Sequence, residues 1–397
     1  MMNATFNNDV TGDYHSVQMT SWMQNISNFP VTEMQGHTGY RNDHEHNVLD
    51  PHARPDPISD SAREVFELIN YVIICPCITL FGIVANVINM VVYAKMGLTD
   101  PVNITLFSLA ISDLLSLITL VWHAICYNPL FRYSDIPFES VEVDFLTAGW
   151  PHLIFSRITS CLTAFITVER CLCVTIPLKV KLLLTARRTR ILILGMYFVL
   201  ITSSCPIYYT TRLDWKFYPS RNRTLLGHVF IENRETIERV SFALNNVFIP
   251  MASFATVAIC TGILVHKLRV KSKWRESTTA PGVGSSKNTS LRDQRIVQMV
   301  IFLSAIFIVC FLPTTVAFLA AAAMQPVYKL DGTGVMHLNS FIVTLTFSFI
   351  LESINSSVNI FVYLKMSSRY KQVFNQLFRK VGAEQGKCAT ITSQKTT

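Results

Sequence analysis

Charged side chains interrupt several long apolar runs of this 397-residue chain. Glu169 and Arg170 stand together at the end of a run that begins near Phe145, and Arg157 lies within the same run. Glu352 lies in the middle of another run. A charge in a hydrocarbon environment costs on the order of 3 kcal/mol or more, so such side chains are expected to be paired or used. The chemistry open to them is reversible ion pairing, which holds or releases neighbouring segments.

Covalent chemistry is not indicated. The serines, histidines and cysteines form neither a catalytic triad nor a metal-binding spacing, so the sequence predicts no catalytic residue, no metal centre and no cofactor. We therefore expect that the chain is not an enzyme. Five of its ten histidines lie in the first 60 residues, where a metal or pH-sensing role is one reading and a solvated polar tail explains them without it: His15, His37, His44, His46 and His52.

The composition is that of a membrane protein. Half of the residues are hydrophobic and only 15% are charged, which is too apolar for a soluble chain of this length. Seven windows are long enough to cross a bilayer, at about 66–94, 103–126, 145–176, 191–211, 241–265, 296–323 and 338–364. Because backbone groups in lipid must bond within the protein, each window predicts a helix. The expected fold is an all-α bundle of seven transmembrane helices.

The distribution of charge sets the orientation and argues against a nucleic-acid partner for a chain of net charge +8. Basic residues cluster at 179–190 and 267–275, which predicts that these loops are cytoplasmic. Residues 1–67 carry ten acids against three arginines, so the amino end is expected outside and the carboxyl end inside. The loop at 212–239 is also fairly basic and weakens this bias. Three glycosylation sequons fall on the outer side, although each is also explained as an unused match: Asn3, Asn25 and Asn222.

The sequence thus divides into four parts. A disordered extracellular tail is expected at 1–65, the transmembrane bundle at 66–364, an amphipathic helix at 367–380 and a disordered cytoplasmic tail at 381–397. Cys388 in the last part is a candidate palmitoylation site, or an unmodified tail cysteine. The protein is expected in the plasma membrane as a multi-pass chain.

Five short motifs occur once each, in consistent order and on consistent sides of the predicted spans. Together they resemble the rhodopsin-like (class A) G-protein-coupled receptors over about 70–378. The motifs are Gly82-x-x-x-Asn86, Leu109-Ala-x-x-Asp113, Glu169-Arg170-Cys171 followed by Pro177-Leu178, Phe311-Leu-Pro313, and Asn359-x-x-x-Tyr363. The amino-acid sequence of the second and third spans is also similar to chemosensory and neuropeptide-receptor-like sequences of gastropod molluscs.

The chain departs from that family at several positions. Cys171, Phe311, Ile360 and Ala258 replace residues of the family's switch consensus. Phe145 stands where most relatives have the cysteine that bonds to the second outer loop, and there is no cysteine between residues 206 and 259. The usual disulfide is therefore expected to be missing.

The resemblance implies a two-state switch that couples to a heterotrimeric G protein. It implies that Arg170 pairs with Asp293 in the resting state, that Pro313 is a hinge in the sixth helix, and that Leu178 packs into the G protein. The assigned switch residues are Glu169, Arg170, Leu178, Asp293, Phe311, Pro313, Asn359 and Tyr363. Asn86, Asp113 and Asn355 are assigned to a polar network in which Asp113 binds sodium or serves as a structural hydrogen-bonding residue. Arrestin and a receptor kinase are further implied partners.

The ligand is constrained by what the third and seventh spans lack. His152 stands where amine receptors carry an aspartate, and Ser353 where opsins carry the retinal lysine. The remaining polar positions at pocket depth are Trp122, His123, His152, Ser156, Arg157 and Glu352. Arg157 and Glu352 pair with each other permanently, or one of them meets a charged group of a peptide or small chemosensory ligand.

Two other classes of function stay open at this stage. A transporter or channel is disfavoured by the lack of an internal repeat or a pair of discontinuous helices. A seven-helix receptor that binds a ligand without signalling, a decoy, is favoured by the departures from the switch consensus. Nucleotide exchange on a Gα subunit discriminates between a decoy and a signalling receptor.

Overall fold

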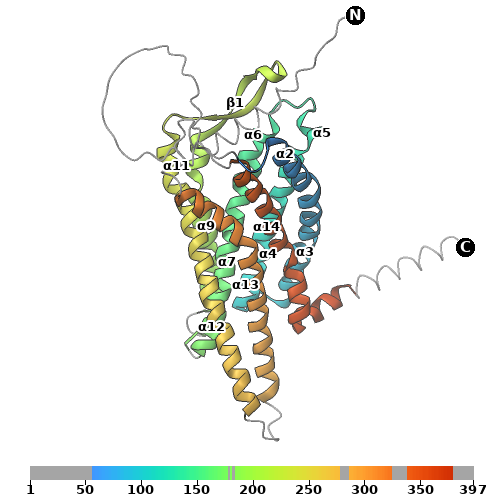
Figure 1. Cartoon of the computed structure of the whole chain (residues 1–397). Coiled ribbons are helices and arrows are strands. Elements are labelled where there is room, and N and C mark those ends of the chain that lie inside the picture. Colours follow the sequence, from blue (N-terminus) through green and yellow to red (C-terminus); the bar gives the residue numbers. More distant parts are fainter. Residues whose placement is uncertain (1–55, 178, 181–183, 278–285, 324–337, 379–397) are drawn as a thin grey trace, which may run out of the picture.

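A computed structural model describes residues 56–177, 179–180, 184–277, 286–323 and 338–378. Seven of its helical segments are long and apolar enough to cross a membrane, and they stand side by side as one bundle (Figure 1). The prediction of an all-α bundle of seven transmembrane helices is confirmed.

The seven segments include several that are continuous chains of shorter elements. The first joins α2 (Asp60–Leu68), the π-helical η1 (Ile69–Ile74) and α3 (Cys75–Met96). The second is α4 (Pro101–Tyr127), and the third joins α6 (Ser140–Asp144), the π-helical η2 (Phe145–Gly149) and α7 (Trp150–Thr175). The fourth is α9 (Ala186–Ser203) with α10 (Cys205–Thr210). The fifth joins α11 (Arg234–Ala243), the π-helical η4 (Leu244–Phe248) and α12 (Ile249–Ser277). The sixth is α13 (Ser286–Ala323), and the seventh is α14 (Leu338–Met366).

Helix ends follow from capping residues in the sequence. Ser59 accepts a hydrogen bond from the backbone of Ala62 at the start of α2, and Asp100 caps α4 by accepting from Val102. Such side chains satisfy the backbone N–H groups that a helix start leaves without intrahelical partners. Asp56 does the same for another helix, because its carboxylate accepts from the backbone N–H groups near the start of α14. The chain that enters the bundle is thereby fastened to the seventh helix.

The interior is packed most tightly around α7, whose segment is the most buried of the seven. Glycine permits the closest approach between α3 and α14, because a Cβ on Gly82 would overlap the hydroxyl of Ser357. Large apolar side chains point away from the bundle instead, among them Leu194, Phe198 and Val309. These exposed side chains form the surface that faces lipid in a membrane.

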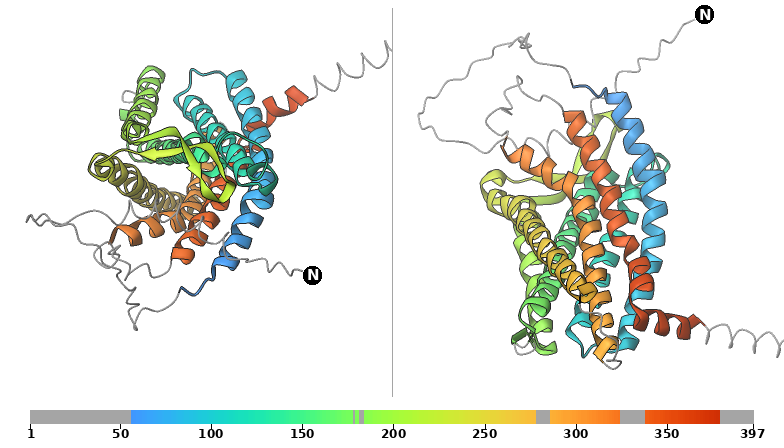
Figure 2. Two further views of the ribbon diagram at one scale, coloured as in Figure 1. Left: turned by 90° about the horizontal axis from the view of Figure 1, so that it is seen from above. Right: turned by 60° about the horizontal axis from the view of Figure 1, so that its bottom comes forward.

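A β-hairpin crosses the end of the bundle that the sequence predicts to be the outer end, as the view from above shows (Figure 2). Its strands β1 (Thr211–Tyr218) and β2 (Arg223–Phe230) pair antiparallel, with Trp215 opposite Leu226. The turn is the short η3 (Pro219–Arg221) followed by Asn222, which adopts the left-handed conformation with φ 48°. The short helix α5 (Pro129–Arg132) lies in the preceding outer loop.

Ion pairs attach this hairpin to the third transmembrane segment. The Glu142 carboxylate accepts hydrogen bonds from Lys216 Nζ at 2.7 Å and from the backbone N–H of His228 at 2.8 Å. Glu139 lies 3.1 Å from Arg221 Nη2, and burial raises the pKa of the Glu139 carboxyl above its usual range. All nine cysteines in the described residues are free. Acid–base contacts therefore stand where the family resemblance would place a disulfide.

An eighth helix follows the bundle at 368–378 and runs off to the side (Figure 2). Tyr370 on this helix is fully buried and donates a hydrogen bond to Asn89 at 2.6 Å. Its ring also packs between Tyr93 and Tyr363. The expected amphipathic helix is thus joined to the inner end of the first and seventh segments by an aromatic cluster.

Candidate functional site

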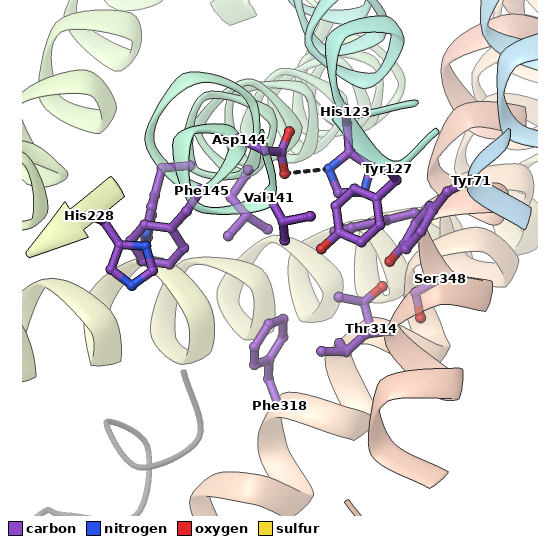
Figure 3. Close-up of a pocket in the computed structure, with 15 residues that line it drawn as sticks. Tyr71, His123, Tyr127, Val141, Asp144, Phe145, His228, Thr314, Phe318 and Ser348 are labelled. Atoms are coloured by element: carbon purple, nitrogen blue, oxygen red, sulfur yellow. Dashed lines mark hydrogen bonds and ion pairs between the residues drawn. The ribbon is translucent and has the colours of Figure 1, made fainter. Parts of the chain in front are cut away.

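A cavity of about 130 Å³ opens at the outer end of the bundle, beneath the hairpin. Figure 3 shows Tyr71, His123 and Tyr127 on one side of it and Phe145 and His228 on the other. Its wall is mainly aromatic and aliphatic, with few polar groups. A mostly apolar cavity with a small number of polar atoms is the usual form of a ligand site.

A buried histidine–aspartate pair is the most polar feature of the cavity wall. His123 Nδ1 lies 2.8 Å from Asp144 Oδ2, and both residues are almost completely buried. The rings of Tyr71 and Tyr127 pack on His123 at centroid distances of 4.5 and 4.4 Å. The sequence pattern indicated His123 but not Asp144, because the apolar window of the third span begins one residue after Asp144.

A second polar cluster lies beyond Thr314, which lines the cavity. The two Glu352 oxygens accept hydrogen bonds from Ser156 at 2.7 Å and from Thr314 at 2.9 Å. His152 Nε2 lies 3.4 Å from the same carboxylate, and its Nδ1 is 2.9 Å from the hydroxyl of Ser116. Three of the predicted pocket residues, His152, Ser156 and Glu352, are therefore brought together.

The permanent pair between Arg157 and Glu352, one of the two predicted alternatives, does not form, although both side chains lie in the described part of the chain. Arg157 Nε donates instead to the backbone carbonyl of Asn245 at 2.9 Å. Its guanidinium also lies 5.9 Å from the ring centre of Phe318. The π-helical η4 brings that carbonyl to Arg157, and the hydroxyls of Ser156 and Thr314 already satisfy Glu352.

Trp122, the remaining predicted pocket residue, donates its indole N–H to Thr147 at 2.8 Å. Among the six predicted positions, His123 lines the cavity described above and the other five do not. The ring of His228 also lines the cavity, and the sequence analysis did not select it. Burial lowers the pKa of His228 below its ordinary value, against the opposing effect of the nearby Glu142 carboxylate.

The predicted polar network in the middle of the bundle is assembled around Asp113. Its carboxylate accepts hydrogen bonds from Thr159 at 2.9 Å, Ser356 at 3.0 Å and Asn359 at 2.9 Å. Asn86 joins it by donating to the Ser356 carbonyl at 2.8 Å. The carboxylate and two hydroxyls offer the oxygen donors that a hard cation such as sodium prefers, so the residues present fit that ion.

Asn355 and the aromatic switch positions lie close to this network. Asn355 lines a small internal cavity together with Asn359. Phe311 stacks on Phe307 with a centroid distance of 4.6 Å, two residues before Pro313 in α13. These residues occupy the middle of the bundle between the outer cavity and the inner end.

At the inner end, Arg170 Nη2 forms an ion pair with the adjacent Glu169 at 2.8 Å. Glu169 is buried. Leu178 and the side chain of Asp293 lie outside the described residues, so the expected pair between Arg170 and Asp293 stays a prediction. Tyr363 is buried against Tyr93 at a ring distance of 5.3 Å.

Of the predicted modification sites, Asn222 is exposed in the turn of the hairpin. Asn3, Asn25 and Cys388 lie outside the described residues. Figure 1 shows the hairpin and the start of α9 at opposite ends of the bundle. Arg187, Arg188 and Arg190 belong to that helix start. The Asn222 sequon and these basic residues therefore lie at opposite ends of the bundle, as the predicted orientation requires.

Comparison with known proteins gives consistent results. The sequence model described as 7 transmembrane receptor (rhodopsin family) matches residues 85–363. The growth hormone secretagogue receptor type 1 of Mustela putorius furo is 25% identical over 333 residues, which cover 80% of this chain and 83% of that receptor. The allatostatin-A receptor of Bombyx mori is 23% identical over 317 residues, 76% of this chain and 77% of that receptor. G-protein coupled receptor 183-B of Danio rerio is 24% identical over 320 residues, 78% and 79% of the two chains.

Proposed function

Because the chain belongs to the rhodopsin family of seven-transmembrane receptors, we propose that it binds an extracellular ligand at the plasma membrane and activates a heterotrimeric G protein. The ligand that we favour is a peptide, since the similar proteins include receptors named for a growth hormone secretagogue and for allatostatin-A. A small chemosensory molecule is the alternative, and the narrower resemblance to gastropod sequences stays a prediction.

One feature of α14 carries the proposal. Glu352, Ser356, Asn359 and Tyr363 recur at helical spacing on one face, and all four are buried. Glu352 accepts a hydrogen bond from Thr314 in the cavity wall, and Ser356 and Asn359 both donate to Asp113. Tyr363 reaches the aromatic cluster at the inner end. A continuous buried polar stripe thus links the outer cavity to the inner face of the bundle.

The mechanism follows from a two-state equilibrium. A ligand that contacts the cavity more favourably in one state shifts the population toward that state. To move a ratio of 1:99 to 99:1, the preference must reach about 10⁴-fold. The proline at position 313 interrupts the hydrogen bonding of α13 and supplies a hinge about which its inner half moves. Arg170 would then leave its resting partner and meet the G protein.

The same proposal fixes the orientation and the other partners. We place the amino end outside the cell and the carboxyl end in the cytoplasm, because the exposed sequon at Asn222 and the basic start of α9 lie at opposite ends. Arrestin and a receptor kinase are the further cytoplasmic partners.

The test is a cell line that displays the receptor on its surface and reports Gα activation. It is challenged separately with a pool of neuropeptides and a pool of waterborne small molecules, beside an Arg170→Ala variant of equal surface expression. A response to either pool that the variant loses supports the proposal, and the active pool identifies the ligand class. Ligand binding without Gα activation would favour a decoy receptor, and a ligand-dependent current without any G protein would favour a channel or transporter.

A further inference from the structure

We propose that the ligand carries a cationic nitrogen group, an ammonium or a guanidinium, that binds to Asp144 in the wall of the outer cavity. The inference rests on the proposed function, since it names the chemistry of the ligand that the receptor recognises. Sequence reasoning did not identify this residue, and the third span has His152 where amine receptors have their aspartate. The proposed cation site at Asp144 lies about two helical turns further out than His152, at the level of the hairpin.

Charge within the cavity singles out this residue. Of the 15 described residues that line the cavity, Asp144 is the only aspartate, glutamate, lysine or arginine. Arg157, the nearest buried base in the third segment, does not line the cavity and is bonded to a backbone carbonyl. An anionic ligand would meet the Asp144 carboxylate here, whereas a cation would pair with it.

The hydrogen bonding of Asp144 is incomplete. Oδ2 contacts His123, but Oδ1 is buried and has no hydrogen-bond partner among the described residues. The side chain is only 4% exposed. A buried carboxylate oxygen without a donor costs more than an ordinary missing hydrogen bond. Asp144 thus keeps an acceptor oxygen for an arriving donor, and Figure 3 shows its side chain in the cavity wall with one oxygen bonded to His123.

Aromatic rings complete the surroundings that a cation prefers. Tyr71, Tyr127 and Phe349 pack around His123, with ring centroids between 4.4 and 5.8 Å from the imidazole. The faces of such rings attract a cation through their quadrupole, most strongly where water is excluded. Lys216, a basic residue of the hairpin, is already paired with Glu142. An acid with a free acceptor, beside aromatic rings, makes a site for a positively charged nitrogen.

The experiment uses the full chain in lipid nanodiscs without any G protein and measures thermal unfolding in the presence of small aromatic probes. Three cations represent the sources of the group: benzylamine for a small amine, phenylalaninamide for a peptide amino terminus and benzamidine for an arginine-like head. Benzyl alcohol and benzoate are the neutral and anionic controls. At least one cation is expected to raise the unfolding temperature, and benzyl alcohol and benzoate are expected not to.

The matched variants are Asp144→Asn and Asp214→Asn. The first keeps an oxygen that accepts from His123 but removes the charge, and should weaken cation binding at least about tenfold. The second removes the same charge from an exposed position on β1 and should leave binding unchanged.

A cation-induced shift that persists in Asp144→Asn, an equal shift with benzoate or benzyl alcohol, or no shift with any cation would overturn the inference. The comparison of probes on the unmodified receptor holds even if Asp144→Asn does not fold. Because the assay contains no G protein, its outcome is independent of whether the receptor signals.

Discussion

Removal of the Glu142 carboxylate should release the outer hairpin, because this side chain attaches the hairpin to the third transmembrane segment. The change is Glu142→Ala, compared with Glu142→Gln and with Glu232→Ala as a control. Glu142 is buried, and its carboxylate accepts from Lys216 Nζ at 2.7 Å and from the backbone N–H of His228 at 2.8 Å. Glu232 is exposed just beyond β2.

The magnitude follows from the two hydrogen bonds. A bond to a charged group contributes about 1.5–3 kcal/mol, and the part-buried backbone N–H of His228 loses such a bond. The Lys216 side chain is 35% exposed and regains water, so its bond is discounted toward the value of a surface ion pair. The alanine variant should therefore destabilise the closed hairpin by about 3 kcal/mol, or about 100-fold in its opening equilibrium. Glutamine keeps one neutral acceptor and should cost about half as much.

Hydrogen exchange of the backbone amides of β1 and β2, read by mass spectrometry on receptor in nanodiscs, measures this opening directly. Exchange should accelerate in the order Glu232→Ala, Glu142→Gln, Glu142→Ala, with the control equal to the wild type. Dithiothreitol should have no effect, because the nine described cysteines are free. Unchanged exchange in Glu142→Ala, or a hairpin that opens on reduction, would refute the reasoning.

Three further predictions concern other parts of the fold. Gly82→Ala should cost about 1–3 kcal/mol by overpacking and lower the unfolding temperature, whereas Gly195→Ala, whose Cβ meets nothing within 4 Å, should not. Asp56→Asn weakens the charged cap of α14 and should speed hydrogen exchange in its first turn, at a cost of no more than about 1 kcal/mol. Burial lowers the pKa of His228 from 6.5, so the folded hairpin favours the neutral ring. This stabilisation is present above pH 6.5 and is lost as the pH falls through the lowered pKa. After correction for the slower intrinsic amide exchange at lower pH, the protection of the hairpin amides should fall on acidification, and His228→Gln should abolish that dependence.

The helical bundle was predictable because membrane-length apolar runs leave few alternatives for the backbone. The outer hairpin was not predicted, although its sequence carries a signal. Leu213, Trp215 and Phe217 alternate with polar residues, and a Pro-Ser-Arg-Asn turn follows at 219–222, which together favour a strand and a hairpin. The loop at 212–239 was interpreted only from its basic charge, as a feature that bears on membrane orientation.

The site was harder to predict than the fold, and the reason is the backbone of the outer half. The π-helical segments η1, η2 and η4 all lie near the outer ends of their helices. Each adds a residue to a turn and rotates the following side chains relative to a regular helix. Arg157 and Glu352 were correctly taken as charges within the bundle, but their partners depend on that rotation. Asp144, at the start of η2, was missed because an apolar window cannot show a charged residue at its edge.

The inner motifs were easier to interpret, since regular helical spacing holds there. Asp113 and Asn359 meet as the order of the motifs implies, and Tyr363 lies in the inner aromatic cluster. What the sequence could not give is the donor set around the carboxylate, to which Thr159 and Ser356 also contribute. Those hydroxyl residues are common in membrane helices and carry no signal alone.

We propose that the receptor catalyses nucleotide exchange on its G protein, and a nucleotide-exchange assay on Gα measures this directly. Purified receptor in nanodiscs is mixed with an excess of each class of Gα, and GTP-analogue uptake is followed with the active ligand pool and without it. We expect that ligand accelerates uptake on at least one Gα and that one receptor loads many Gα molecules. An Arg170→Ala variant that folds and binds ligand is expected to do neither. Ligand binding with no acceleration on any Gα, or equal acceleration by Arg170→Ala, would contradict it.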